Sequence, residues 1–228
     1  MTNNVTQQAA VNNIRGVSDI VFCIDHSGSM EHCINGVKNH IRDFIATLEN
    51  MSGNVVVDWR IGLVLYTSKE IRFLNLTQDL SAIREVLSEK NKKSNEFTPG
   101  AIDFAVTNTS WRGRSHRVIV VFTDESLKEG WSNDEPDMGA GKFNELLIKL
   151  ATAKIQLLYF GPYCDYYNEF NMVPKAMVNT VAHFDDVNFN ELLKNIAATV
   201  SKSSTNAQMG IPVPPLVYNL KSISIKTH

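Results

Sequence analysis

The sequence predicts a three-layer, doubly wound α/β protein with a mainly parallel, six-stranded sheet and helices on both faces. Short β-rich runs alternate with longer amphipathic segments, which is typical of parallel strands joined by crossover helices. The runs at 20–24 and 118–122 are continuously apolar, as expected for strands buried on both faces. Only the runs at 55–66 and 71–76 are joined by a short turn, so we expect one antiparallel edge strand.

In the first half of the chain, a strand at 19–24 precedes a helix at 31–48. That helix is indicated by apolar residues that recur every three or four positions, which places them on one face. They are Ile34, Val37, Ile41, Phe44, Ile45 and Leu48. The two hairpin strands follow, and then a short helix at 81–88.

In the second half, Pro99 marks a helix start, because proline is favoured in the first helical turn. The elements expected from there on are a helix at 99–108, a strand at 117–123, a helix at 142–153 and a strand at 155–161. We then expect a helical segment at 166–179 interrupted at Pro174, a strand at 181–184 and a closing helix at 188–200.

These elements predict one folded domain over residues 17–201, between two segments of different composition. Residues 1–16 are polar and amide-rich, and we expect them to be flexible. Residues 202–228 contain the run GIPVPPLVYNL, whose prolines favour an extended tail. The sequence does not decide whether this tail docks on the domain or on another protein.

Composition excludes several function classes. A net charge of −2 gives no reason to expect nucleic acid or an anionic membrane as a partner. No apolar run reaches the roughly 18 residues that cross a bilayer. The N-terminus lacks the features of a signal peptide, and Cys23 and Cys33 lie at positions expected to be buried, as thiols in a reducing compartment. We therefore expect a cytoplasmic protein.

Five oxygen-bearing residues predict a metal site. Asp25, Ser27 and Ser29 follow the first strand, Thr98 precedes Pro99, and Asp124 follows the strand at 117–123. Carboxylate and hydroxyl oxygens suit a hard divalent cation such as Mg²⁺. The alternative is that these residues are helix caps and turn residues.

In these five residues and their order, the chain resembles the von Willebrand factor type A domain family over residues 17–201. The resemblance implies a sheet ordered 3-2-1-4-5-6 and a metal-ion-dependent adhesion site made of the five residues, holding Mg²⁺ or Mn²⁺. It also implies that Thr98 and Asp124 exchange between direct and water-mediated contact with the metal. Two departures stand out: Glu125 replaces a frequent glycine, and residues 95–97 replace a Gly-rich run.

The resemblance implies a non-enzymatic interaction module. We expect Ser27 and Ser29 to be direct ligands and Asp25 to act through water, so that an Asp or Glu of a protein partner completes the coordination. The alternative is a metal-dependent phosphatase or hydrolase with Asp25 as nucleophile, although Ser27 stands where such enzymes usually have a second Asp.

The resemblance also implies the kind of cellular complex in which the protein acts. Leaderless single-domain members occur in bacteria beside AAA+ ATPases, or with kinases and phosphatases in tellurite-resistance-type stress clusters. In both settings they act as adaptors, and the sequence leaves the choice open.

At the rim of the site we expect His26 to point to solvent or to the partner. The acidic segment 125–139, with Trp131, is either a solvated loop or a contact surface.

Overall fold

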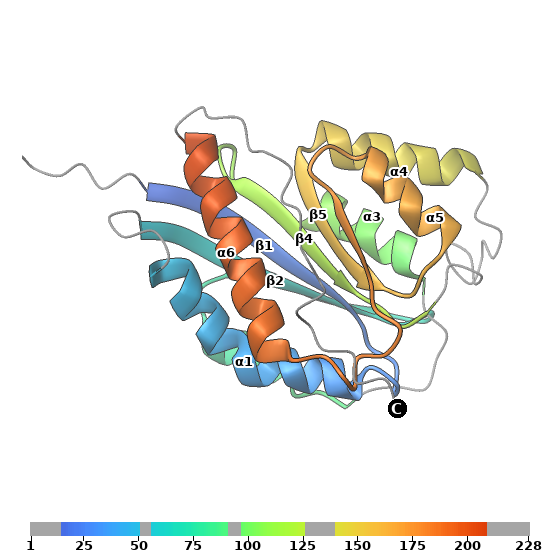
Figure 1. Cartoon of the computed structure of the whole chain (residues 1–228), viewed down its shortest axis with the longest axis horizontal. Helices are drawn as coiled ribbons and strands as arrows, with labels where there is room; N and C mark the ends of the chain where they lie inside the picture. The colour runs from blue at the N-terminus through green and yellow to red at the C-terminus, as the bar shows by residue number, and fades with distance from the viewer. Residues whose placement is uncertain (1–14, 51–55, 91–96, 126–139, 209–228) are drawn as a thin grey trace, which may run out of the picture.

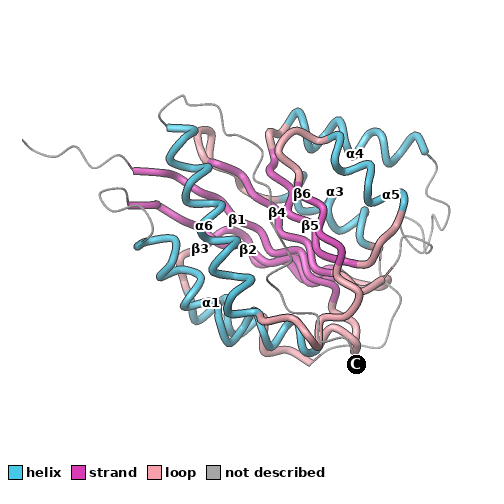
Figure 2. Tube along the Cα trace, viewed as in Figure 1, coloured by secondary structure: helices cyan, strands magenta, loops and turns pink. Residues whose placement is uncertain are grey.

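The computed structural model describes residues 15–50, 56–90, 97–125 and 140–208. It contains one six-stranded sheet with the strand order β3-β2-β1-β4-β5-β6 (Figures 1 and 2). The strands are β1 (Arg15–Asp25), β2 (Val56–Tyr66), β3 (Ile71–Thr77), β4 (His116–Phe122), β5 (Ile155–Gly161) and β6 (Met177–Thr180). Every neighbouring pair is parallel except β2 and β3, which confirms the predicted fold class and its antiparallel edge strand.

Helices cover both faces of the sheet. They are α1 (Glu31–Asn50), α2 (Leu80–Val86), α3 (Thr98–Asn108), α4 (Ala140–Thr152), α5 (Asp165–Asn168), the 3-10 helix η2 (Glu169–Met172) and α6 (Phe189–Gln208). α1 and α6 pack together on one face, while α3, α4 and α5 lie on the other (Figure 1). No helix among the described residues is long and apolar enough to span a membrane.

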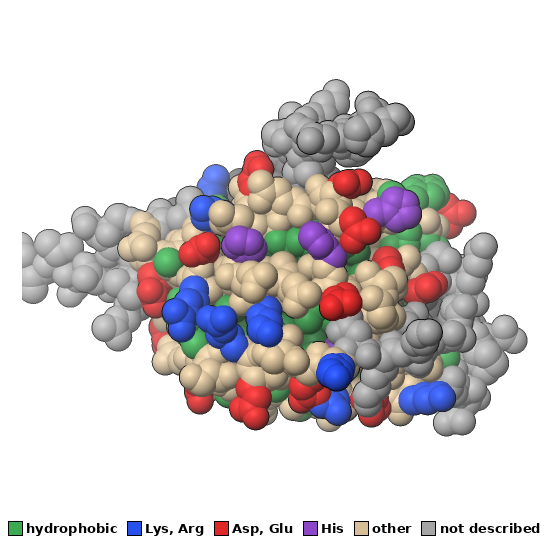
Figure 3. Space-filling model, turned by 90° about the horizontal axis from the view of Figure 1, so that it is seen from below, with side chains coloured by type: hydrophobic (Ala, Val, Ile, Leu, Met, Phe, Trp, Pro, Cys, Tyr) green, Lys and Arg blue, Asp and Glu red, His purple; other side chains and the backbone are tan. Residues whose placement is uncertain are grey.

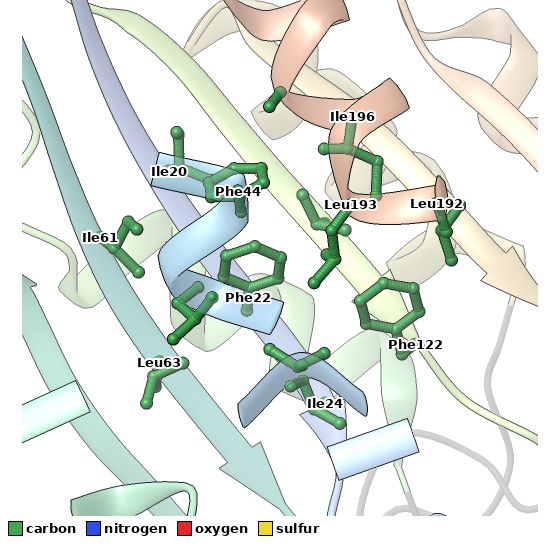
Figure 4. Close-up of a cluster of buried hydrophobic side chains, with 14 of the residues drawn as sticks. Ile20, Phe22, Ile24, Phe44, Ile61, Leu63, Phe122, Leu192, Leu193 and Ile196 are labelled. Carbon is green, nitrogen blue, oxygen red and sulfur yellow. The ribbon is translucent and has the colours of Figure 1, made fainter. Parts of the chain in front are cut away.

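Strand β1 shows how the sequence pattern builds the two core layers. Ile20, Phe22 and Ile24 point to the α1 and α6 side, and the alternate residues Val21 and Cys23 point to the α3 and α4 side. All five are fully buried. Figure 4 shows the first layer, in which the ring of Phe22 lies between those of Phe44 and Phe122. The surface seen from below is mainly polar, with apolar side chains showing only in small areas (Figure 3).

A buried ion cluster closes the amino-terminal end of β1. Asp19 accepts five hydrogen bonds, from the side chain of Arg60, from the backbone and side chain of Arg112, and from the Ser115 hydroxyl. Arg112 continues to Asp58 on β2, with 2.8 Å between Nη1 and Oδ2. These hydrogen bonds hold the pKa of Asp19 below its usual value although its burial acts in the opposite direction. The cluster therefore ties β1, β2 and the loop before β4 together.

Two expected elements are wrong in position. Residues 166–179 are not one interrupted helix: α5 and η2 end at Met172, and β6 occupies residues 177–180 in place of the expected strand at 181–184. Pro174 has no amide hydrogen to continue a helix, and Lys175 takes a left-handed φ of 68°, so the chain turns there and enters the sheet beside β5.

The closing helix is longer than expected. α6 continues to Gln208, so residues 201–208 are helical although we expected the domain to end at 201. Ser201, Ser203 and Ser204 are buried there, and Ser204 lies against Gly16 at the start of β1. A serine-rich run gives no apolar stripe, so the sequence pattern alone did not mark this last part of the helix.

Candidate functional site

The five predicted residues lie at the carboxyl-terminal edge of the sheet, where the winding direction reverses. β1 and β4 are neighbours, and β1 leads into α1 on one face while β4 is followed by α4 on the other. Open α/β sheets bind ligands at such a switch point, outside the carboxyl ends of the strands. Asp25 is the last residue of β1, and Asp124 lies two residues beyond the end of β4.

The loop after β1 brings one carboxylate and two hydroxyls together. The backbone amide of Ser27 donates to Oδ1 of Asp25 at 2.8 Å, so the carboxylate fixes the turn of its own loop. The hydroxyl oxygens of Ser27 and Ser29 are 2.9 Å apart. Asp25 and Ser27 are buried and Ser29 is exposed, so the pair of hydroxyls reaches from the interior to solvent.

Thr98 enters the site from the first residue of α3. Its side chain is buried, and its hydroxyl lies 2.8 Å from the hydroxyl of Tyr66 at the end of β2. It also lies 3.4 Å from the hydroxyl of Thr123, which in turn lies 3.4 Å from Oδ2 of Asp25. A chain of three hydroxyls thus connects α3 to the carboxylate of Asp25.

Asp124 contributes a buried carboxylate oxygen to the site. Its Oδ1 atom is buried, yet it has no hydrogen-bond partner among the described residues. Buried polar atoms of native proteins are nearly always partnered, by protein, by water or by a ligand. A buried carboxylate oxygen in this position therefore fits the role of a cation ligand.

The electrostatics of Asp25 point the same way. Its pKa rises from the usual 3.8 to about 7, mainly because the carboxyl is buried, and hydrogen bonds from Ser27 act in the opposite direction. The negative charges of Asp124 and Glu125 raise it further. Among ion pairs between described residues, none neutralises Asp25 or Asp124. The described ion pairs thus leave the negative charge of these two carboxylates uncompensated.

The donor set fits a hard cation. Every candidate ligand is a hydroxyl or carboxylate oxygen, which is the chemistry that Mg²⁺ and Mn²⁺ prefer. The described part of the chain contains no group of three or more His, Cys, Asp or Glu residues that could hold a metal. Because Asp25 and Asp124 are the two carboxylates among the five candidate ligands, a cation here would also depend on the hydroxyls of Ser27, Ser29 and Thr98.

Some expectations about the surroundings of the site are wrong or lie outside the described residues. His26 does not point to solvent: it is only 1% exposed, and its backbone amide donates to the carbonyl of Tyr66 at 2.8 Å, which extends the pairing of β1 with β2. Trp131 and residues 126–139 lie outside the described part of the chain.

Two residues of the site were not expected from the sequence. Thr123 precedes Asp124, and its hydroxyl also accepts from the amide of Glu125 at 3.2 Å. Tyr66 is the last residue of β2, the neighbour of β1, so its place at a strand end is the signal that would have found it. Tyr66 also lines a groove of about 490 Å³ between the β2–β3 turn and α3, whose described lining includes none of the five candidate ligands.

Comparison with known proteins identifies the same domain type. The model of the von Willebrand factor type A domain matches residues 19–209. No curated protein matches the chain in sequence.

Solved structures share the fold at low sequence identity. A von Willebrand factor type A structure from Catenulispora acidiphila is 14% identical with a TM-score of 0.60, and the match covers 82% of this chain and 43% of that one. The protein BatB from Bacteroides thetaiotaomicron is 16% identical with a TM-score of 0.55, over 82% and 98%. Proximal thread matrix protein 1 from the mussel byssus, solved with a zinc-occupied adhesion motif, is 14% identical with a TM-score of 0.58, over 80% and 46%. The chain thus spans less than half of the first and third proteins.

Proposed function

Because the chain belongs to the von Willebrand factor type A domain family, we propose that it is a non-enzymatic module that captures a protein partner through a bound divalent cation. The ligands are Asp25, Ser27, Ser29, Thr98 and Asp124. The observation that carries the proposal is the buried, unpartnered Oδ1 atom of Asp124 beside the crowded carboxylate of Asp25. A bound cation supplies the positive charge that attracts a carboxylate of the partner.

The described residues of the site have different roles. Asp25 holds the turn that presents Ser27, and the exposed Ser29 hydroxyl marks the side open to solvent. Neutral hydroxyl ligands leave most of the charge of a divalent cation uncompensated, so an Asp or Glu of the partner gains a strong electrostatic contact. Direct contact by Asp124 reduces that gain, which makes its position a means of setting partner affinity.

The same contacts count against a hydrolase. Asp25 is fully buried, Oδ1 accepts from the Ser27 amide, and Oδ2 faces the Thr123 hydroxyl. A nucleophilic carboxylate needs access to the substrate, and this one serves to hold its loop.

For the metal we propose Mg²⁺ or Mn²⁺. Zinc in proteins favours nitrogen and sulfur donors, whereas this donor set contains oxygen alone. The zinc in the mussel structure belongs to that protein. For the setting we propose a cytoplasmic adaptor in a bacterial stress response, whose partner is an AAA+ ATPase or a kinase or phosphatase; neighbouring genes distinguish these.

Calorimetry tests the metal site. The wild-type chain should bind Mg²⁺ or Mn²⁺ with modest affinity, and Asp25→Ala should give no binding heat. Asp186→Ala, a substitution of an exposed carboxylate between β6 and α6, is the matched control and should bind as the wild type does. Equal binding by wild type and Asp25→Ala would mean that the cation sits elsewhere.

A further inference from the structure

We propose that Tyr66 is a positioning residue for the cation site: it holds the Thr98 hydroxyl and joins the two loops that carry the hydroxyl ligands. The inference rests on the proposed function and names a residue outside the five ligands. Its basis is that Tyr66 makes a backbone contact to one ligand loop and a side-chain contact to the other.

The backbone contact fixes the loop after β1. Tyr66 is the register partner of Asp25 in the parallel pairing of β1 with β2. Its carbonyl accepts from the amide of His26 at 2.8 Å, one residue beyond the end of β1. The path of the chain into Ser27 and Ser29 therefore begins from a hydrogen bond to Tyr66.

The side-chain contact fixes the start of α3. The ring of Tyr66 is 1% exposed and packs in the core layer that contains Ala101 and Ile102 of α3. Its hydroxyl lies 2.8 Å from that of Thr98, the shortest link of the hydroxyl chain. A ring held by core packing has little freedom to move, so the position of its hydroxyl is set by the fold and not by the site.

The donor and the acceptor of each hydrogen bond in the hydroxyl chain follow from the carboxylate of Asp25 at its end. An ionised carboxylate only accepts, so Thr123 donates to Asp25. Thr98 then donates to Thr123, and Tyr66 donates to Thr98. A threonine hydroxyl has one proton and two lone pairs. The proton of Thr98 is thus directed to Thr123, and Tyr66 holds the Thr98 oxygen at 2.8 Å, while the hydroxyl of Tyr167 also reaches Thr98. Tyr66 therefore helps to set the position of the oxygen that a cation would contact.

Removal of the Tyr66 hydroxyl should therefore weaken cation binding without removing a ligand. Tyr66→Phe keeps the ring and its packing and removes the shortest hydrogen bond of the Thr98 hydroxyl. We expect roughly fivefold weaker Mn²⁺ binding, the effect of about one neutral hydrogen bond. A residue that merely stabilises the fold would lower the melting temperature in chelator and leave the affinity of the folded protein unchanged.

A double-mutant cycle shows whether the effect passes through Thr98. Mn²⁺ is titrated by calorimetry into the full chain as wild type, Tyr66→Phe, Thr98→Ala and the double variant. In the Thr98→Ala background, Tyr66→Phe should change the affinity less than about twofold. Tyr163→Phe, which alters an exposed tyrosine between β5 and α5 whose hydroxyl donates to Asp165, is the control and should bind Mn²⁺ as the wild type does.

The outcomes separate this inference from the proposed function. If the wild type binds Mn²⁺ and Asp25→Ala does not, the metal site stands, and an unchanged affinity of Tyr66→Phe overturns the role of Tyr66 alone. If the wild type does not bind, both fail. If Tyr66→Phe does not fold, Thr123→Val removes the next hydroxyl of the chain, and unchanged Mn²⁺ affinity in that variant overturns the inference.

Discussion

In the metal-free protein, the buried carboxylate of Asp25 should make the fold less stable as pH rises, and Asp25→Asn should relieve this. The pKa of Asp25 is raised from 3.8 to about 7, so the folded state binds the proton more tightly than the unfolded state. The contribution of Asp25 to stability is therefore most favourable below about pH 4, becomes less favourable as pH rises to 7, and is level above that. Asparagine carries no charge and keeps an oxygen that accepts from the Ser27 amide.

The shift sets the size of the effect. A change of roughly 3 units at about 1.4 kcal/mol each gives an upper limit of about 4 kcal/mol above pH 7. Relaxation and water entry reduce this, so we expect Asp25→Asn to be about 2 kcal/mol more stable at pH 8 and equal to the wild type near pH 4.

Urea unfolding in chelator at pH 4.5, 6, 7 and 8 measures this difference. Asp186→Asn, an exposed substitution, should follow the wild-type curve at every pH. The reasoning is refuted if Asp25→Asn is the less stable protein at pH 8, or if its advantage does not grow between pH 4.5 and 7.

Other substitutions test the site and the scaffold separately. Asp124→Asn should leave the fold intact, with a melting temperature in chelator at or above that of the wild type, and should abolish Mg²⁺-dependent capture of partners in a pull-down. Thr98→Ala and added chelator should remove the same proteins from that pull-down; retention in all samples would show that recognition does not use the metal. Asp19→Ala should lower the free energy of unfolding by about 1.5–3 kcal/mol, the range for hydrogen bonds to a charged group, because Arg60 and Arg112 lose this partner while Arg112 keeps Asp58. The folded variant should keep its Mg²⁺ affinity. Burial lowers the pKa of His116 to about 4, so this residue should reduce the stability of the fold as pH falls from 6.5 to 4. His116→Gln should make that loss smaller in acid unfolding curves.

The sequence predicted most of the fold because its strands are buried on both faces and therefore strongly apolar. It failed at 166–179, where apolar residues at helical spacing belong to a short helix, a turn and an edge strand. The turn at Pro174 and Lys175 and the pairing of Met177 and Val178 with β5 decide that choice, and the periodicity of the segment reveals neither.

The site was predicted in part for a related reason. The five ligand positions follow from their places beside strand ends and a helix start, which local patterns reveal. The roles of Tyr66 and Thr123 depend on which strands become neighbours and on which side chains then meet, at 2.8 and 3.4 Å. His26 was expected to point to solvent or to a partner, and the continued pairing with β2 places it inside.

Strand β1 carries a buried aspartate near each end, and the two ends are available for different kinds of engineering. Asp19 is saturated with hydrogen bonds from two arginines, whereas Asp25 faces like charge. Ligand loops could therefore be exchanged at one end to create new recognition, while the ion cluster at the other end keeps the scaffold folded. A library built on residues 26–30 and the start of α3 would begin from a framework that already tolerates an electrostatically unfavourable site.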